Sequence, residues 1–154
     1  MRHAIQDSYP ARFAHCHGCG PANRDGWRLK SYVEGDEVVL RHTPAPAYTG
    51  GVPDHAYGGL LASLLDCHGA ASATAFAYRA AGGEVGDGGA LPRFVSGTLT
   101  VVYRRPTPMG VELVVRGRLA EAKGRKVTVD LELSADGEVC VTGQMIALEI
   151  PAEY

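Results

Sequence analysis

A single carboxylate, Asp66, lies in the middle of the chain's one long, strongly apolar helix candidate. It is the only acidic residue between Asp54 and Glu84. A carboxylate on a largely buried helix loses hydration, which is costly unless the group is paired or used. Two helical turns upstream, Gly58 and Gly59 would place free backbone N–H groups at the helix start. A lone carboxylate combined with such donors is sufficient for hydrolytic chemistry.

The segment that carries these groups is predicted to be helical. Residues 57–78 contain no proline and are dominated by leucine, alanine and serine, so they predict a helix of roughly 30 Å. Small residues recur on one face at helical spacing. They are Gly59, Ala62, Ser63, Asp66, Gly69, Ala70 and Ala73. Because such a stripe lets another surface approach closely, we expect Asp66 at a packed seam or a narrow cleft.

Strands are predicted on both sides of this helix. The expected strands are residues 27–33 and 37–42 before it, and 94–105, 111–122, 126–133 and 139–150 after it. We expect the last four to form an antiparallel meander and the sheet to curl around the helix, because sheets twist. This is an α+β layout in one domain, residues 1–154, with residues 1–26 as a lead-in segment.

Composition restricts the possible partners. The 154 residues are 45% hydrophobic and 21% charged, with a net charge of −2, so we expect no nucleic-acid partner. Asp66 and His68 interrupt the only long apolar run, and we expect no membrane partner. The first 13 residues lack the apolar core of a secretory signal. Four cysteines without such a signal predict a reducing, cytoplasmic location.

Three segments, in this order, carry a family likeness. Residues 16–20 read Cys-His-Gly-Cys-Gly, residues 53–59 lead into the glycine pair, and residues 96–106 form a strand that ends in Tyr-x-x-Pro. Asp66 follows Gly58 by eight residues. Together these features resemble the hotdog-fold acyl-CoA thioesterases, in particular the phenylacetic-acid-pathway thioesterase-like branch. The resemblance implies a hotdog fold, a curved antiparallel sheet wrapped around one long central helix.

The resemblance also implies a mechanism for hydrolysis of an acyl-CoA. Asp66 would act as general base or nucleophile, and the backbone N–H of Gly58 would polarise the thioester carbonyl. Ser96 would position the attacking water. Relatives build this site across a dimer, so a homodimer or homotetramer is expected. The chemistry requires no metal and no cofactor.

One position departs from the family pattern. The usual histidine before the glycine pair is Tyr57, whose hydroxyl can donate a hydrogen bond but cannot share a proton near neutral pH. His55 and His68 are the nearby histidines that could take over this role. For His68 the alternative is an interior histidine whose ring nitrogens are both hydrogen-bonded. The expected substrate-binding residues are Tyr57, Gly59, His55, Arg104 and Arg105. The two arginines would bind the phosphates of coenzyme A.

Other interpretations remain open at this point. Asp66 could cap a buried loop or pair with an arginine, Gly58 could serve close packing, and Ser96 could be a small packing residue. A non-catalytic acyl-CoA-binding protein is the alternative function, motivated by Tyr57, and a hotdog dehydratase is the third. The pair Cys16 and Cys19 suggests zinc, but the sequence holds no second Cys-x-x-Cys to complete four ligands.

Overall fold

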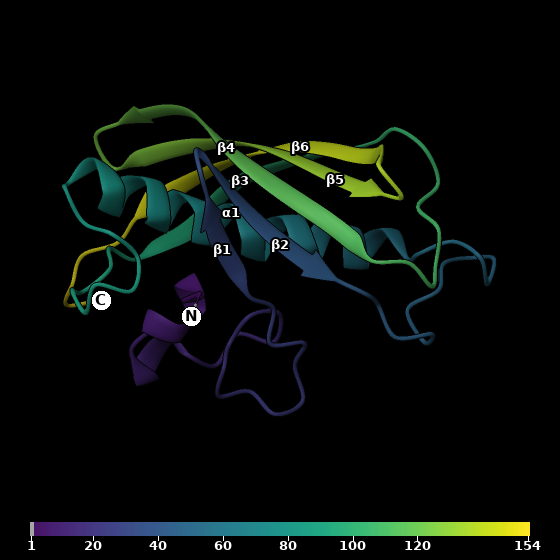
Figure 1. Ribbon diagram of the computed structural model, residues 1–154, viewed down its shortest axis with the longest axis horizontal. Coiled ribbons are helices and arrows are strands. Elements are labelled where there is room, and N and C mark those ends of the chain that lie inside the picture. Colours follow the sequence, from purple (N-terminus) through teal and green to yellow (C-terminus); the bar gives the residue numbers. More distant parts are fainter. Residues whose placement is uncertain (1) are drawn as a thin grey trace.

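The computed structural model describes residues 2–154 and consists of one long helix and one sheet (Figure 1). The lead-in holds two short 3₁₀ helices, η1 (Ile5–Ser8) and η2 (Ala11–Phe13). The main elements are β1 (Ser31–Glu34), β2 (Glu37–His42), α1 (Gly58–Ala80), β3 (Phe94–Tyr103), β4 (Leu113–Lys123), β5 (Lys126–Ala135) and β6 (Glu138–Glu149). α1 contacts all six strands, so the helix is the centre of the fold. The predicted hotdog layout is confirmed.

The six strands form one antiparallel sheet in the order β1-β2-β4-β5-β6-β3. The predicted four-strand meander is therefore wrong in one respect, because β3 pairs with β6 at the sheet edge and only β4, β5 and β6 form a meander. β3 is followed by residues 104–112, which include Pro106 and Pro108. This connection is longer than a hairpin loop of about 2–5 residues. It carries the chain past β6 and β5 to β4, which pairs with β2.

The start of the first predicted strand also shifts. β1 begins at Ser31, not at residue 27, because Arg28 adopts a left-handed backbone with φ of 50° that interrupts an extended run. Trp27 turns instead toward the rings of His17 and Tyr48. The predicted turn at Asp136 and Gly137 is present, and both residues have positive φ as a tight hairpin requires.

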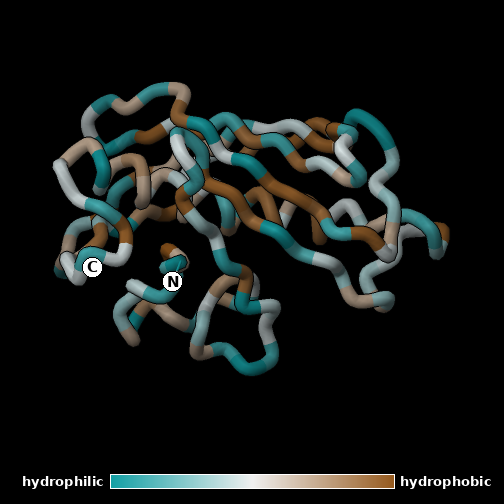
Figure 2. The backbone as a smooth tube through the Cα atoms, viewed as in Figure 1, coloured by the Kyte–Doolittle hydropathy of each residue, from teal (hydrophilic) through white to brown (hydrophobic). Residues whose placement is uncertain are grey.

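The core lies between α1 and the sheet, where Figure 2 shows apolar stretches on the strands. Leu60, Leu64 and Leu65 are fully or almost fully buried there. Helix and sheet approach closely, because a Cβ at Gly69 would lie 2.8 Å from the Cβ of Met145. By length and composition α1 could cross a membrane, but 67% of its most apolar window is buried inside the protein, as in the core helix of a folded domain.

The lead-in is packed against the body of the protein. Ile5 and Gln6 are buried, and the Gln6 side chain bonds both the backbone and the hydroxyl of Ser31. The backbone amides of Trp27 and Leu29 donate to the carbonyls of residues 17 and 18. The loop with the first two cysteines is thereby fixed beside β1 and the helix.

Candidate active site

Asp66 lies on the side of α1 that the sheet leaves partly open. Most of the central helix is buried, including Gly69 and Ala73 of the small-residue stripe. The other members of the stripe remain half-buried: Gly59, Ala62, Ser63, Asp66 and Ala70. The carboxylate therefore stands half-buried among small side chains. The predicted position at a packed seam or a narrow cleft stays a prediction.

Ser96 of β3 lies directly against this carboxylate. Its hydroxyl donates a hydrogen bond to Oδ1 of Asp66 at 2.5 Å. An ionised carboxylate only accepts hydrogen bonds, and charge-assisted O–H···O⁻ bonds are short and strong. Because Ser96 engages one oxygen, the second oxygen of Asp66 keeps its capacity to accept a proton or to attack a carbon. The structure thus brings together two of the three residues predicted to be catalytic.

A β-bulge sets the position of Ser96. The register of β3 against β6 shifts between Ser96 and Thr98, so Gly97 is the extra residue. A Cβ at Gly97 would lie 2.8 Å from the carbonyl oxygen of Ile146, which explains the glycine. Bulges redirect side chains beside functional sites. Sequence reasoning missed Gly97, although a lone glycine within a strand pattern is a signal for a bulge.

The other predicted donor, Gly58, is the first residue of α1. The residue that caps the helix, Tyr57, makes no side-chain capping bond, and its carbonyl accepts from the amides of Leu60 and Leu61. Within residues 2–154, the amides of Gly58 and Gly59 have no hydrogen-bond acceptor. They are therefore free donors at the positive end of the helix dipole.

Gly58 and Asp66 of one chain are too far apart to act on one carbon atom. Eight residues separate them along the helix, which is about 12 Å at 1.5 Å per residue. A thioester carbon needs both groups within hydrogen-bonding or bonding reach. Within one chain, Gly58 and Asp66 therefore cannot both reach the same carbon atom.

Tyr103 supports the helix start from the end of β3. Its hydroxyl donates to the carbonyl oxygen of Gly58 at 2.8 Å, and its ring lies 3.5 Å from where a Cβ at Gly58 would be. This bond fixes the peptide that joins Gly58 to Gly59. Sequence reasoning used Tyr103 only as part of the Tyr-x-x-Pro motif. Its reach to the helix depends on tertiary packing.

The structure places Tyr57 beside the helix start and 54% exposed. Its ring packs so closely on Gly59 that a Cβ there would lie 2.4 Å from the ring. His55 is exposed in the preceding loop, where its backbone bridges to Pro108. Tyr57 and Gly59 therefore form one surface beside the free amides of Gly58 and Gly59. His55 precedes this surface by two residues in the chain.

His68 points into the core and takes no part in this surface. Its Nε2–H donates to the carbonyl of Val38 at 2.8 Å, so Nδ1 accepts from the hydroxyl of Ser31, also at 2.8 Å. Burial lowers the pKa of His68 to about 4. The reading of His68 as a satisfied interior histidine is confirmed, and it cannot replace the histidine missing at position 57.

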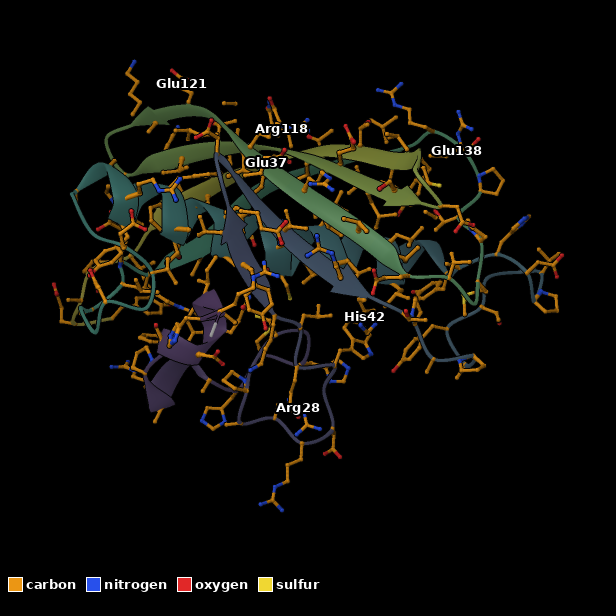
Figure 3. The ribbon with its side chains drawn as sticks, in the orientation of Figure 1. Arg28, Glu37, His42, Arg118, Glu121 and Glu138 are labelled. Carbon is orange, nitrogen blue, oxygen red and sulfur yellow. The ribbon has the colours of Figure 1, made fainter. Side chains whose placement is uncertain are left out.

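Arg104 and Arg105 follow Tyr103 and are exposed. Arg104 Nε donates to the hydroxyl of Thr142, and Arg105 forms an ion pair at 2.9 Å with Glu138, which Figure 3 labels. Exposed pairs of this kind contribute little stability, about 0–1 kcal/mol. Both guanidinium groups can therefore leave these partners for an anionic ligand at low cost.

The edge strand β3 has an apolar, solvent-facing surface. Val95, Val102 and Tyr103 are 37%, 38% and 53% exposed. An edge strand with exposed apolar side chains is a template for pairing with another chain. Of these residues, Tyr103 lies on the helix side of the strand, where its hydroxyl reaches Gly58.

The sequence model of the thioesterase superfamily matches residues 54–142 of this chain. The structure of a thioesterase superfamily protein from Shewanella loihica PV-4 matches this one with a TM-score of 0.68. The two sequences are 38% identical, and the match covers 91% of this chain and 97% of that chain. Two further structures share the fold. The E. coli PaaI protein from the phenylacetic acid degradation operon is 16% identical, covering 80% of each chain, with a TM-score of 0.63. The protein smu.793 from Streptococcus mutans UA159, bound to acetyl-CoA, is 13% identical over 79% of this chain and 88% of that chain, with a TM-score of 0.62. A search of curated proteins finds no match.

Proposed function

The chain belongs to the thioesterase superfamily, and from that premise we propose that it hydrolyses an acyl-CoA thioester to a free acid and coenzyme A. The observation that carries this proposal is the bond between Ser96 and Asp66 on the open side of α1. It leaves one carboxylate oxygen available for chemistry. Coenzyme A as the leaving group is supported by the acetyl-CoA bound to the related Streptococcus mutans protein.

In the proposed reaction a water molecule attacks the thioester carbon. Asp66 accepts one proton from that water, while Ser96 holds the carboxylate in place. The electron pair of the carbonyl moves to its oxygen, where the amide of Gly58 stabilises the developing charge. The tetrahedral intermediate then expels the thiolate of coenzyme A, which takes the proton from Asp66. In the alternative route, Asp66 attacks the carbon itself, and the thiolate of coenzyme A leaves as a mixed anhydride forms. Water then hydrolyses this anhydride to the free acid and the Asp66 carboxylate, and the proton that is released passes to the thiolate.

The proposal includes a homodimer, which can further pair into a tetramer. Asp66 of one subunit would meet Gly58 of the partner subunit, because the two groups of one chain lie about 12 Å apart. The exposed edge strand β3 supports a contact between copies, since it offers unpaired backbone groups together with Val95 and Val102. A two-fold contact of this kind builds two equal sites.

Substrate binding is assigned to the surface at the helix start. Tyr57 would donate its hydroxyl to the substrate carbonyl or to a neighbouring polar group, while Gly59 permits close approach. His55 would contact the substrate from the preceding loop. Arg104 and Arg105 would bind the phosphates of coenzyme A, because guanidinium groups bind phosphate in two-pronged geometry.

Hydrolysis of a panel of acyl-CoA esters tests this function. Asp66→Asn keeps the size of the side chain but removes the base, so kcat/KM should fall about 10²–10⁴-fold. Asp130→Asn is the matched control, because Asp130 is exposed on β5 and pairs only with Gln144 among residues 2–154. Released coenzyme A should be quantified by chromatography, since thiol reagents would also modify the protein's cysteines.

One observation favours a second candidate, a non-catalytic acyl-CoA-binding protein. Tyr57 replaces the usual histidine, and His68 is held in the core. Calorimetry that shows tight binding of CoA esters, with no turnover of any panel member, would establish that function and refute hydrolysis. The hotdog dehydratase is not proposed, because it needs a histidine beside the carboxylate, and the residues hydrogen-bonded to Asp66 in the described chain include none.

A further inference from the structure

Three cysteine thiols from two distant parts of the chain meet beside α1. Cys16 and Cys19 come from the lead-in loop, and Cys67 comes from the helix, directly after Asp66. The three sulfur atoms lie within 4.8 Å of one another, and those of Cys16 and Cys67 are 3.9 Å apart. None of the three is in a disulfide.

The spacing of these sulfur atoms fits a shared metal ion. A tetrahedral Zn²⁺ with Zn–S bonds of about 2.3 Å places its sulfur ligands about 3.8 Å apart. The separation of 3.9 Å between Cys16 and Cys67 agrees with this value. The sequence alone left the Cys-x-x-Cys pair without further ligands, and the structure adds Cys67 as the third.

The backbone of the loop is shaped around the sulfur atoms. The amide of Gly20 closes the turn by donating to the carbonyl of Cys16 at 2.8 Å. A Cβ at Gly18 would lie 2.4 Å from the sulfur of Cys67, so any side chain there would displace the thiol. Glycine at this position therefore lets the loop bring its two cysteines up to Cys67.

We propose that Cys16, Cys19 and Cys67 bind one Zn²⁺ ion through their thiolates. The fourth coordination position is left to an external ligand such as water, on the solvent-exposed side of Cys16. The site is separate from the proposed hydrolysis, because adjacent helical residues point about 100° apart, so Cys67 faces away from the surface of Asp66. The ion would tie the lead-in to the central helix.

Metal analysis of the reduced protein tests this site. Wild type reconstituted with Zn²⁺ and desalted should hold about one zinc per chain, and with Co²⁺ it should show strong sulfur-to-cobalt charge-transfer absorption. Cys67→Ala should lose both signals. Cys140→Ala is the matched control and should keep both, because Cys140 is also buried but lies in β6 and donates to the carbonyl of Glu138.

A second measurement keeps the test decisive if Cys67→Ala folds poorly. Zn²⁺ added to metal-free wild type should slow hydrogen exchange at the amides of residues 16–29 at least tenfold, since ligand binding stabilises the lead-in. Less than about a tenth of a zinc per wild-type chain would overturn the site. So would equal metal loss in Cys140→Ala, or a disulfide among the three cysteines in protein purified without oxygen.

Discussion

Two polar residues only two positions apart on α1, Asp66 and His68, have opposite surroundings. Asp66 is half-buried on the open side of the helix, where Ser96 engages one of its two oxygens. His68 is fully buried on the core side, where both ring nitrogens are hydrogen-bonded. The first has unused bonding capacity at an accessible surface, and the second has none. Chemistry is therefore expected at Asp66, while His68 stabilises the fold.

The helix geometry explains this division. Side chains two residues apart point about 200° apart, so His68 faces β1 and β2 while Asp66 faces Ser96 of the edge strand β3. The same reasoning separates Gly59, half-buried at the donor surface, from Leu61 in the core. The open side of the helix is thus the surface proposed to act on substrate, and the core side holds the helix in place.

After Asp66→Asn, removal of the amide at the helix start should have the largest effect on the open side. Gly58→Pro deletes the N–H, and proline fits the first helical position. Loss of one oxyanion donor should lower kcat/KM about 10²–10³-fold, with little change in stability. Steady-state hydrolysis and thermal unfolding together check this expectation.

Gly58→Ala is the control for this change, because it retains the amide. Its Cβ would lie 3.5 Å from the ring of Tyr103, an ordinary contact. Its activity should stay within a few-fold of wild type. Equal losses in Gly58→Ala and Gly58→Pro would show that the backbone N–H has no catalytic role.

On the core side, His68 should make stability depend on pH without acting in catalysis. Its pKa is about 4 in the folded protein against 6.5 in the unfolded chain, so acid protonates the unfolded state first. This contribution is complete above pH 6.5 and is lost as pH falls toward 4. At pH 5 it should have decreased by about 2 kcal/mol relative to pH 8. Denaturant unfolding at both pH values measures the change.

His68→Gln isolates this contribution, because glutamine can bond to Ser31 and Val38 but does not titrate in this range. Its free energy of unfolding should be lower than that of wild type at pH 8, and it should fall less steeply toward pH 5. A pH dependence that is the same in both proteins would contradict the assignment to His68.

The smallest of these effects is expected at Ser96. Ser96→Ala removes one charged hydrogen bond to Asp66, so kcat/KM should fall about tenfold, equivalent to about 1.4 kcal/mol. Ser134→Ala on β5 is the control and should change kcat/KM less than twofold. A loss at Ser96 as large as that of Asp66→Asn would mean that the hydroxyl itself takes part in the chemical step.

Much of the fold could be predicted from the sequence because local patterns fix it. The proline-free small-residue segment predicted α1, and alternation with turn residues such as Asp136 and Gly137 predicted β5 and β6. The pairing of β3 could not be read this way. Its partner depends on where residues 104–112 carry the chain, and that is decided by packing of the whole sheet.

The site was predictable only in part for the same reason. Spacing singled out Asp66 and Gly58, and family resemblance suggested Ser96, which the structure places beside Asp66. The support from Tyr103 and the meeting of Cys67 with the lead-in cysteines join residues distant in sequence. No local pattern encodes such contacts. The roles in catalysis stay predictions.

The central claim is that Asp66 and Gly58 act from different subunits, and mixed dimers test it most directly. Asp66→Asn and Gly58→Pro carry different tags and are co-refolded in equal amounts, and each alone should be almost inactive. A mixed dimer has one site with both native groups, so random pairing should restore about a quarter of wild-type activity. A mixture that stays as inactive as its two parents would contradict a site shared between subunits.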